Sequence, residues 1–244
     1  MKSPSGVGVY MTRAWAASDH NVGKHAARIA ASGCDWVAIC VAATDGWEPS
    51  AGTLRDAARD YRAHGLRVHV WSLDAPHLSG KRCGERMALA YAAAAADGVV
   101  LDIEAAWRGR GSDVAVYIAT VRAEMDAAHP LGVTSYPCQT WGAGKGMPWS
   151  FMALGADYFS PQLYRTAEDT KRTSLALREA RNLYREVVPL VAAFDVRGTQ
   201  AGQLREHMTR IGRESSGIGV WCDAQLDTQE RAVIRRYAES RRWR

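Results

Sequence analysis

The sequence predicts one α/β domain over residues 1–244, a single (β/α)8 barrel of the TIM-barrel type. Three observations support this prediction. Eight short apolar runs alternate with Ala-, Leu- and Arg-rich stretches of helical periodicity. A length of 244 residues is ordinary for such a barrel and sufficient for a large core. No GxGxxG motif follows the first run, which disfavours an open dinucleotide-binding sheet.

The apolar runs are the expected strands. They are about six residues long and apolar on both faces, which is typical of parallel strands covered by helices. In chain order they are Val7–Thr12, Trp36–Ala42, Arg67–Leu73, Gly98–Ile103, Leu131–Tyr136, Tyr158–Leu163, Val187–Phe194 and Gly217–Cys222.

The stretches between the strands are the expected outer helices. They are Val22–Ser32, Thr53–His64, Lys81–Ala96, Ser112–His129, Thr170–Arg185, Gln200–Glu214 and Thr228–Ser240, with Pro148–Leu154 as the weakest helix. A glycine stands shortly before several strands, as expected of helix C-caps and return turns: Gly33, Gly65, Gly98, Gly155 and Gly217.

The composition is that of a globular protein, with 47% apolar and 23% charged residues. The sequence contains no uninterrupted apolar run of about 18 residues, so it predicts no membrane span. No signal peptide precedes the first strand, so we expect synthesis in the cytoplasm, with any release or transport to a cell wall by another route. Five Cys without a CxxC pair are expected to be reduced and buried. The sequence contains no Cys/His cluster, so we expect no metal site, and we expect no cofactor.

The formal net charge is +5, and basic residues gather near the C-terminus. They are Arg231, Arg235, Arg236, Arg241, Arg242 and Arg244. This segment is either a solvated helix with a basic tip or a surface that attracts a polyanion such as an anionic cell wall. Nucleic acid is the less expected partner.

Catalytic groups of a (β/α)8 barrel lie at the C-terminal ends of its strands. Here these ends carry acids, aromatics and amides: Tyr10, Asp45, Trp47, Trp71, Asp74, Asp102, Glu104, Tyr136, Gln162, Tyr164, Asp195, Trp221 and Asp223. Few cations and no Gly-rich anion loop are present among them, which disfavours a phosphate at this end. The ring suits a neutral polyhydroxylated ligand, meaning a sugar.

The fourth strand has the sharpest pattern, Asp97-Gly98-Val99-Val100-Leu101-Asp102-Ile103-Glu104. Side chains alternate along a strand, so Asp102 and Glu104 share the inward face. Like charges this close favour one protonated carboxyl beside an ionised one. That combination is what protonation of a glycosidic oxygen requires. The alternative is a pair that binds an Arg or caps the next helix.

The fourth strand resembles the motif D-G-x-D-x-D-x-E of the family 18 glycoside hydrolases, the chitinases and endo-β-N-acetylglucosaminidases. Asp97, Gly98, Asp102 and Glu104 match it, and Val100 replaces the middle Asp. Weaker similarities extend along the chain: Gly8-Val9-Tyr10 with Trp15, Gln162-Leu163-Tyr164, and Gly219-Val220-Trp221-Cys222-Asp223.

The resemblance implies a retaining, substrate-assisted hydrolase of β-linked N-acetylhexosamine polymers, peptidoglycan or chitin-like. Glu104 would be the general acid/base, and Asp102 and Tyr164 would hold the substrate acetamido group. Trp221 would be the floor of the sugar subsite. The remaining expected substrate-binding residues are Tyr10, Trp71, Asp74, Tyr136, Gln162, Asp195 and Asp223.

Three departures from the family pattern keep other interpretations open. The third strand, His69–Asp74, lacks an SxGG pattern, Arg165 replaces an acid or amide, and Val100 removes a carboxylate. The family 25 lysozymes also carry DxE on strand four, but their first-strand Asp is absent here. A non-catalytic barrel is the competing class, either a glycan-binding module or a structural component of a larger assembly such as a phage particle.

Overall fold

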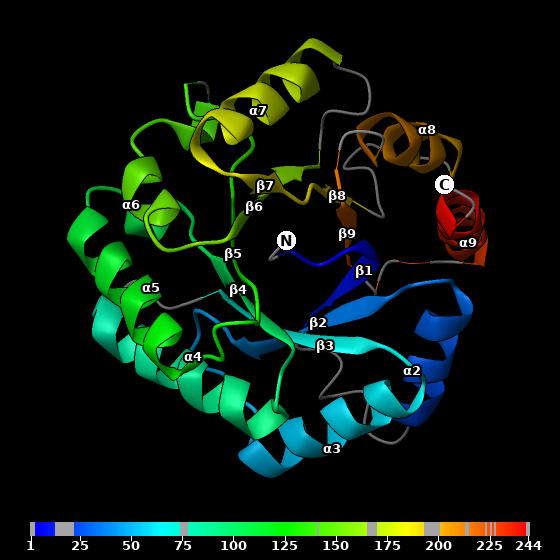
Figure 1. Cartoon of the computed structure of the whole chain (residues 1–244), viewed down its shortest axis with the longest axis horizontal. Helices are drawn as coiled ribbons and strands as arrows, with labels where there is room; N and C mark the ends of the chain where they lie inside the picture. The colour runs from blue at the N-terminus through cyan, green and yellow to red at the C-terminus, as the bar shows by residue number, and fades with distance from the viewer. Residues whose placement is uncertain are drawn as a thin grey trace.

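The computed structural model describes residues 3–12, 22–73, 78–140, 142–164, 170–192, 201–212, 215–222, 224, 226 and 228–242. Their strands form one closed parallel barrel, which confirms the predicted fold class (Figure 1). The strands are β1 (Gly6–Met11), β2 (Trp36–Ala42), β3 (Arg67–Leu73), β4 (Gly98–Asp102), β5 (Leu131–Ser135), β6 (Tyr158–Leu163), β7 (Glu186–Val187), β8 (Leu190–Ala192) and β9 (Gly217–Trp221). β1 pairs with both β2 and β9, and β5 pairs with β6, so the ring has no open edge.

Helices surround the ring of strands (Figure 1). They are α2 (Val22–Ala31), α3 (Ala51–Ala63), α4 (Gly80–Ala94), α5 (Gly111–Glu124), α6 (Trp149–Ala153), α7 (Thr170–Leu183), α8 (Ala201–Gly212) and α9 (Thr228–Arg242). The short α6 agrees with the weak helix expected there. Within the described ranges, no helix combines the length and apolar character needed to cross a membrane.

The seventh strand differs from the expected continuous Val187–Phe194. It is split into β7 and β8, and both segments pair with β6. Pro189 stands between them and has no N–H to donate to a ladder. Its carbonyl nevertheless accepts from Gly219 N at 2.9 Å, so the break is local. Residues 193 and 194 lie outside the described part of the chain.

Several element ends also differ from the sequence-based expectations. β4 ends at Asp102 rather than Ile103, and α5 ends at Glu124 rather than His129. Met125 is already extended, so it stops the helix. Ala95, not a glycine, takes the left-handed conformation that ends α4, with φ 45°. Gly98, which was expected to belong to such a turn, has instead a packing role.

Rings packed on glycines fill the lower barrel. Three pairs of neighbouring strands show this arrangement: Trp36 on Gly8, His69 on Gly98, and Tyr158 on Gly132. A Cβ on Gly8 would lie 1.9 Å from the Trp36 indole, and one on Gly98 would lie 2.4 Å from His69 Nδ1. Glycine at these strand positions therefore makes room for large inward-facing rings.

Aspartates fasten the N-terminal rim of the barrel, where the strands begin. Each precedes an even-numbered strand and accepts a hydrogen bond from the backbone N–H near the start of the strand before it. The pairs are Asp35 with Val7 N at 2.9 Å, Asp97 with Val68 N at 2.7 Å, and Asp157 with Leu131 N at 2.9 Å. The backbone N–H of each aspartate also binds the carbonyl of the same partner residue. We call these three two-point contacts the aspartate clamps.

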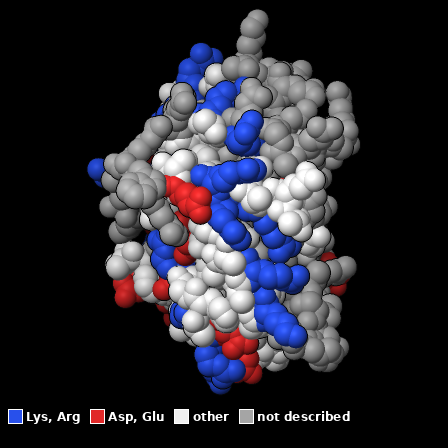
Figure 2. All heavy atoms as spheres, turned by 90° about the vertical axis from the view of Figure 1, so that its right-hand side faces the viewer, with Lys and Arg blue, Asp and Glu red and all other residues white. Residues whose placement is uncertain are grey.

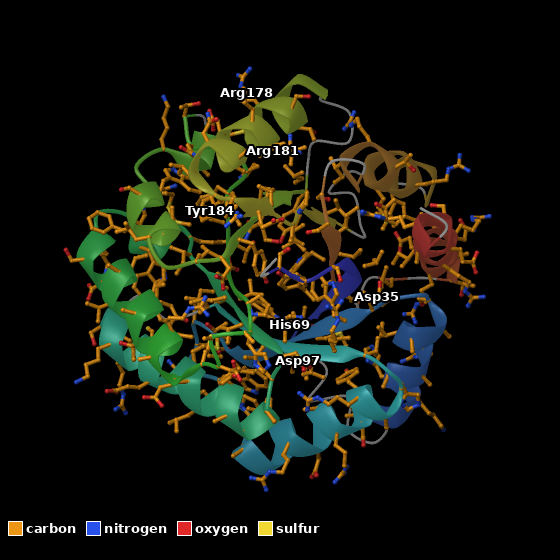
Figure 3. All side chains as sticks on the ribbon, viewed as in Figure 1. Asp35, His69, Asp97, Arg178, Arg181 and Tyr184 are labelled. Atoms are coloured by element: carbon orange, nitrogen blue, oxygen red, sulfur yellow. The ribbon has the colours of Figure 1, made fainter. Side chains whose placement is uncertain are left out.

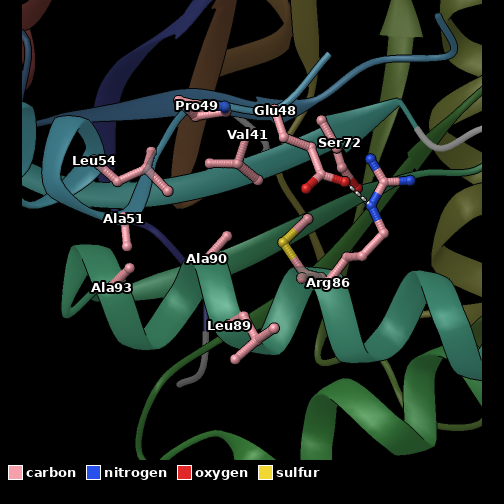
Figure 4. Close-up of a pocket in the computed structure, with 12 residues that line it drawn as sticks. Val41, Glu48, Pro49, Ala51, Leu54, Ser72, Arg86, Leu89, Ala90 and Ala93 are labelled. Atoms are coloured by element: carbon pink, nitrogen blue, oxygen red, sulfur yellow. Dashed lines mark ion pairs between the residues drawn. The ribbon is translucent and has the colours of Figure 1, made fainter. Parts of the chain in front are cut away.

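A small cavity of about 120 Å³ lies between the barrel wall and helices α3 and α4 (Figure 4). Its wall is mostly apolar, and Arg86 of α4 forms an ion pair there with Glu48 of the β2–α3 loop. This pair joins the loop to the helix. The five Cys are free and buried, as expected.

Candidate active site

The predicted carboxylate pair lies at the C-terminal end of β4. Asp102 is the last residue of the strand and is buried, while Glu104 is half-buried two residues later. Glu104 occupies the position before the short 3-10 helix Ala105–Trp107, but its side chain makes no capping hydrogen bond. The alternative of a helix-capping acid therefore has no support in this geometry.

Gln162 at the end of β6 holds the two carboxylates together. Its Nε2 donates to Asp102 Oδ1 at 3.0 Å and to Glu104 Oε1 at 2.9 Å. A side-chain amide has two N–H donors, so one nitrogen satisfies both contacts. Among the described residues, Glu104 Oε2 has no hydrogen-bond partner, and this oxygen is available to a ligand.

An aromatic cluster adjoins the carboxylates. Trp221 of β9 is half-buried and stacks with Tyr164, with ring centroids 6.3 Å apart and planes inclined by 30°. Trp71 meets the same indole edge-on at 5.1 Å and donates its Nε1–H to the Met11 carbonyl at 2.9 Å. The hydrogen bond and the packing fix the orientation of the rings at this end of the barrel.

Tyr10 lies deeper, with its ring 1% exposed and 6.2 Å from that of Trp221. Burial raises the pKa of the Tyr10 phenol, the Ser160 hydroxyl partly offsets this, and the charge of Asp102 adds to the rise. Burial also raises the pKa of Tyr164 well above its ordinary value, and the negative charge of Asp102 contributes. Both phenols therefore stay protonated at neutral pH and can act as hydrogen-bond donors.

The turn after Glu104 is held by a network that sequence reasoning missed. Trp107 is buried between the Arg110 guanidinium, 4.7 Å from its ring, and the Tyr117 ring at 5.5 Å. Tyr117 shares a 2.8 Å hydrogen bond with Ser72 of β3, and Arg110 donates to Asp113 at 2.9 Å. The network fixes the backbone that carries Glu104. No motif in the sequence signals it, because its contacts join separate elements.

The structure places some of the remaining residues singled out in the sequence, and others lie outside its described part. Tyr136 is half-buried and its hydroxyl accepts from Ala105 N at 3.3 Å, so it lies beside the carboxylate segment. Val100 is fully buried on the inward face, one step below Asp102. Asp74, Asp195 and Asp223 lie outside the described residues, as do Trp15 and Arg165. Gln162 was expected to line the site, but its hydrogen bonds to both carboxylates were not expected.

Metal binding has no support in the described ranges. They contain no group of three or more His, Cys, Asp or Glu side chains arranged to hold an ion. The described residues of the site supply carboxylates, phenols and an amide. These groups can donate, accept and transfer protons beside an aromatic surface.

Comparisons with known proteins place the chain among (β/α)8 barrels. No family model and no curated protein matches the sequence. Among solved structures, a family 18 glycoside hydrolase chitinase of Flavobacterium johnsoniae has a TM-score of 0.68 at 10% identity, covering 98% of this chain and 95% of that one. A family 5 glycoside hydrolase of Bifidobacterium longum, solved with Manβ1-4GlcNAc, has 0.71 at 13%, covering 98% and 79%.

A third similar structure is not described as a hydrolase. The xylanase and α-amylase inhibitor protein of Scadoxus multiflorus has a TM-score of 0.61 at 10% identity, covering 96% of this chain and 98% of that one. At identities this low, the likeness establishes the fold alone: the chain is a (β/α)8 barrel with the architecture that these hydrolases and this inhibitor share.

Proposed function

We propose that the chain is a retaining glycoside hydrolase that cleaves β-linked N-acetylhexosamine glycans, peptidoglycan or chitin-like, with the substrate's acetamido group as nucleophile. The observation that carries this proposal is the Gln162 bridge between Asp102 and Glu104. It brings an acid with one unoccupied oxygen beside a second carboxylate, at the barrel end where catalytic groups lie. The chitinase among the structurally similar proteins is consistent with it.

The spacing of the carboxylates favours retention of configuration. Because one amide nitrogen binds both, the bound oxygens lie no further apart than two hydrogen-bond lengths. Inverting enzymes need carboxyl groups about 6.5–9.5 Å apart to admit a water molecule between acid and base. The two bridged oxygens lie closer together than that, which disfavours an inverting pair, and in the proposed mechanism retention follows from the acetamido nucleophile.

Each group then has a defined task. The acetamido oxygen attacks the anomeric carbon while Glu104 delivers a proton to the glycosidic oxygen, and the bond to the leaving sugar breaks. Asp102 accepts a hydrogen bond from the acetamido N–H and balances the oxazolinium charge. The protonated Tyr164 phenol donates to the acetamido oxygen. Water then opens the oxazolinium, and Glu104 takes back a proton.

The aromatic cluster supports a sugar ligand. Trp221 is half-buried, so one part of its indole stays accessible while Tyr164 and Trp71 hold the ring in place. An aromatic face fixed in this way suits the apolar face of a pyranose ring. We assign Trp221 as the subsite floor. Tyr136 contributes to the wall, while Trp71 and Tyr10 support the floor from below.

The test is to compare fully acetylated and deacetylated oligosaccharides of the same length. Substrate assistance requires the acetamido group, so the deacetylated oligomer should resist cleavage and a thiazoline mimic of the oxazoline should inhibit competitively. Equal cleavage of both oligomers would refute the substrate-assisted mechanism. An NMR assay of the anomer formed first reports retention or inversion independently.

A non-catalytic glycan-binding barrel is the second candidate. Val100 favours it, because the substitution removes a carboxylate neighbour of Asp102 and leaves an apolar wall. The inhibitor protein with this architecture gives an example of a barrel named for binding rather than hydrolysis. Binding of N-acetylglucosamine oligomers without turnover, in wild type and in Val100→Asp, would favour this candidate.

The basic face over α9 and α2 suits an anionic polymer such as a charged cell-wall component. Figure 2 shows a band of Lys and Arg side chains on this side of the molecule. Lys24, Arg28, Arg235 and Arg236 are exposed, and the backbone of Arg235 approaches the turn at Gly33 after α2. A binding assay with anionic wall polymer at rising salt concentration tests this partner. Arg244 lies outside the described residues.

A further inference from the structure

A second cavity, with a polar wall, lies at the opposite end of the barrel from Asp102 and Glu104. It has a volume of about 280 Å³ and is lined by Ser3, Pro4, Arg67, His69, Asp97, Ala128, His129 and Pro130. Its wall is built from the chain before β1, the start of β3, and the loops before β4 and β5. The size suits a small molecule rather than a polymer.

His69 is the most informative group of this cavity. Its side chain is only 2% exposed, and neither ring nitrogen has a hydrogen-bond partner among the described residues. Its pKa is lowered to about 3, mainly by burial and also by the charges of Arg67 and His129, while Asp97 partly opposes the shift. The imidazole is therefore neutral at ordinary pH and offers one N–H donor and one nitrogen acceptor. An apolar ring would fill the same space without leaving polar atoms unpaired.

Asp97 lies beside His69 (Figure 3), and Arg67 lines the same cavity, so these two residues supply the charges. Arg67 uses only Nη2 for hydrogen bonds, with the carbonyl and hydroxyl of Ser5, and its other N–H groups have no partner among the described residues. Asp97 uses Oδ2 for Val68 N and Arg62. Within the described part of the chain, nothing engages its Oδ1. The wall thus presents a cation, a neutral imidazole and one carboxylate acceptor.

We propose that this cavity binds a small oxyanion that keeps a hydroxyl group at neutral pH, as inorganic phosphate does. The Arg67 guanidinium matches the charge and the planar pair of oxygens. Asp97 Oδ1 requires a donor, which the single P–OH group supplies. The His69 N–H completes the set as a donor to a further phosphate oxygen.

The same groups predict discrimination between anions of similar shape. Sulfate at neutral pH has no hydroxyl group, so it would bring a bare oxygen against the Asp97 carboxylate and offer no donor to its Oδ1. Repulsion and unpaired polar groups reject such a ligand. The acetate ion also has no hydroxyl group, so it should be rejected in the same way. Phosphate is therefore expected to bind more tightly than sulfate or acetate.

The experiment titrates the full-length protein, with 15N-labelled histidine, against inorganic phosphate, glycerol 3-phosphate, sulfate and acetate at equal ionic strength. Phosphate is expected to shift the His69 ring resonances saturably and to raise the melting temperature, and sulfate to do so at least about tenfold more weakly. The two phosphate arms separate free phosphate from a monoester. Equal responses to all four anions, or unchanged His69 resonances, would overturn the proposal.

Variants locate the effect. Arg67→Gln should weaken phosphate binding about tenfold or more. Arg59→Gln, a substitution of an arginine with 69% side-chain exposure, should not. His69→Phe keeps the ring that packs on Gly98 and should abolish binding. Glu104→Gln should bind phosphate as wild type does, since its site is at the other end. Retained binding in both Arg67→Gln and His69→Phe would place the anion elsewhere and refute the assignment.

Discussion

At the N-terminal rim, Asp35, Asp97 and Asp157 accept hydrogen bonds from backbone N–H groups, whereas at the C-terminal rim Asp102 and Glu104 accept from one side-chain amide. A backbone donor belongs to the sheet, so a carboxylate bound to it stabilises the fold. The side-chain amide of Gln162 leaves Glu104 Oε2 without a partner among the described residues, so this oxygen can meet a ligand. The comparison teaches that hydrogen-bond partners, more than burial, separate structural acids from catalytic candidates.

The largest expected effect tests the catalytic end. Glu104→Gln should lower hydrolysis by roughly 10²- to 10⁴-fold, because the amide cannot deliver a proton. The free energy of unfolding should change little, since Glu104 is half-buried and, among the described residues, its side chain hydrogen-bonds Gln162 alone. Steady-state rates and urea unfolding measure the two quantities. Activity within a few-fold of wild type would end the assignment of Glu104 as the acid.

The reverse pattern is expected at the N-terminal rim. Asp157→Ala removes the acceptor of Leu131 N and the ion-pair partner of Arg122, and should lower the free energy of unfolding by about 1–3 kcal/mol. The rate per folded molecule should be unchanged. Asp56→Ala is the control, because Asp56 is 64% exposed and pairs only on the helix surface. A large rate loss in Asp157→Ala without a stability loss would contradict the comparison.

His69 should give the fold an acid sensitivity of its own. Its pKa is about 3 in the folded protein and 6.5 in its ordinary state, so the unfolded chain binds the proton first as pH falls. Stability should therefore fall from about pH 6.5 towards pH 3, by up to about 1.4 kcal/mol per pH unit from this group. His69→Phe should remove that part of the slope. Parallel stability profiles for the two proteins in phosphate-free buffer would show that His69 does not titrate in this way.

The smallest expected effect concerns Val100. Val100→Asp restores a carboxylate beside Asp102, and a shared proton should raise the rate several-fold if the barrel is a hydrolase. The same change places a polar group at a fully buried position, so unfolding should become easier by about 1–3 kcal/mol. Val100→Asn controls for polarity and size without the charge. Equal rates in all three proteins would remove the proposed role of proton sharing.

The sequence predicts the barrel well because its signals are local and repeated. Apolar runs and helical periodicity place eight strands, and the Asp102–Glu104 alternation places both acids on the inward face. The predicted ends of strands and helices were less accurate where a single residue decides them. Pro189 interrupts the seventh strand, and Met125 ends α5 early.

Contacts between distant elements could not be predicted in the same way. Gln162 was expected at the rim, but its simultaneous contact with both acids depends on the closure that brings β4 and β6 to one mouth. The unpartnered nitrogens of His69 depend equally on three-dimensional packing. The aspartate clamps did leave a signal, an Asp before β2, β4 and β6, which becomes visible when strand starts are aligned. The expected substrate-binding roles of Asp74, Asp195 and Asp223 remain predictions, because these residues lie outside the described part of the chain.

The aspartate clamps also imply an order of folding. Each clamp joins residues only 26 to 29 positions apart, so forming it closes a short loop of chain. Ring closure pairs β1 with β9, and the Ser3–Ser216 contact beside it spans 213 positions. Because the entropy lost in closing a loop grows with its length, we expect the clamped strand pairs to assemble early. The pairing of β1 with β9 would then be a late step, reached after most of the chain has left the ribosome.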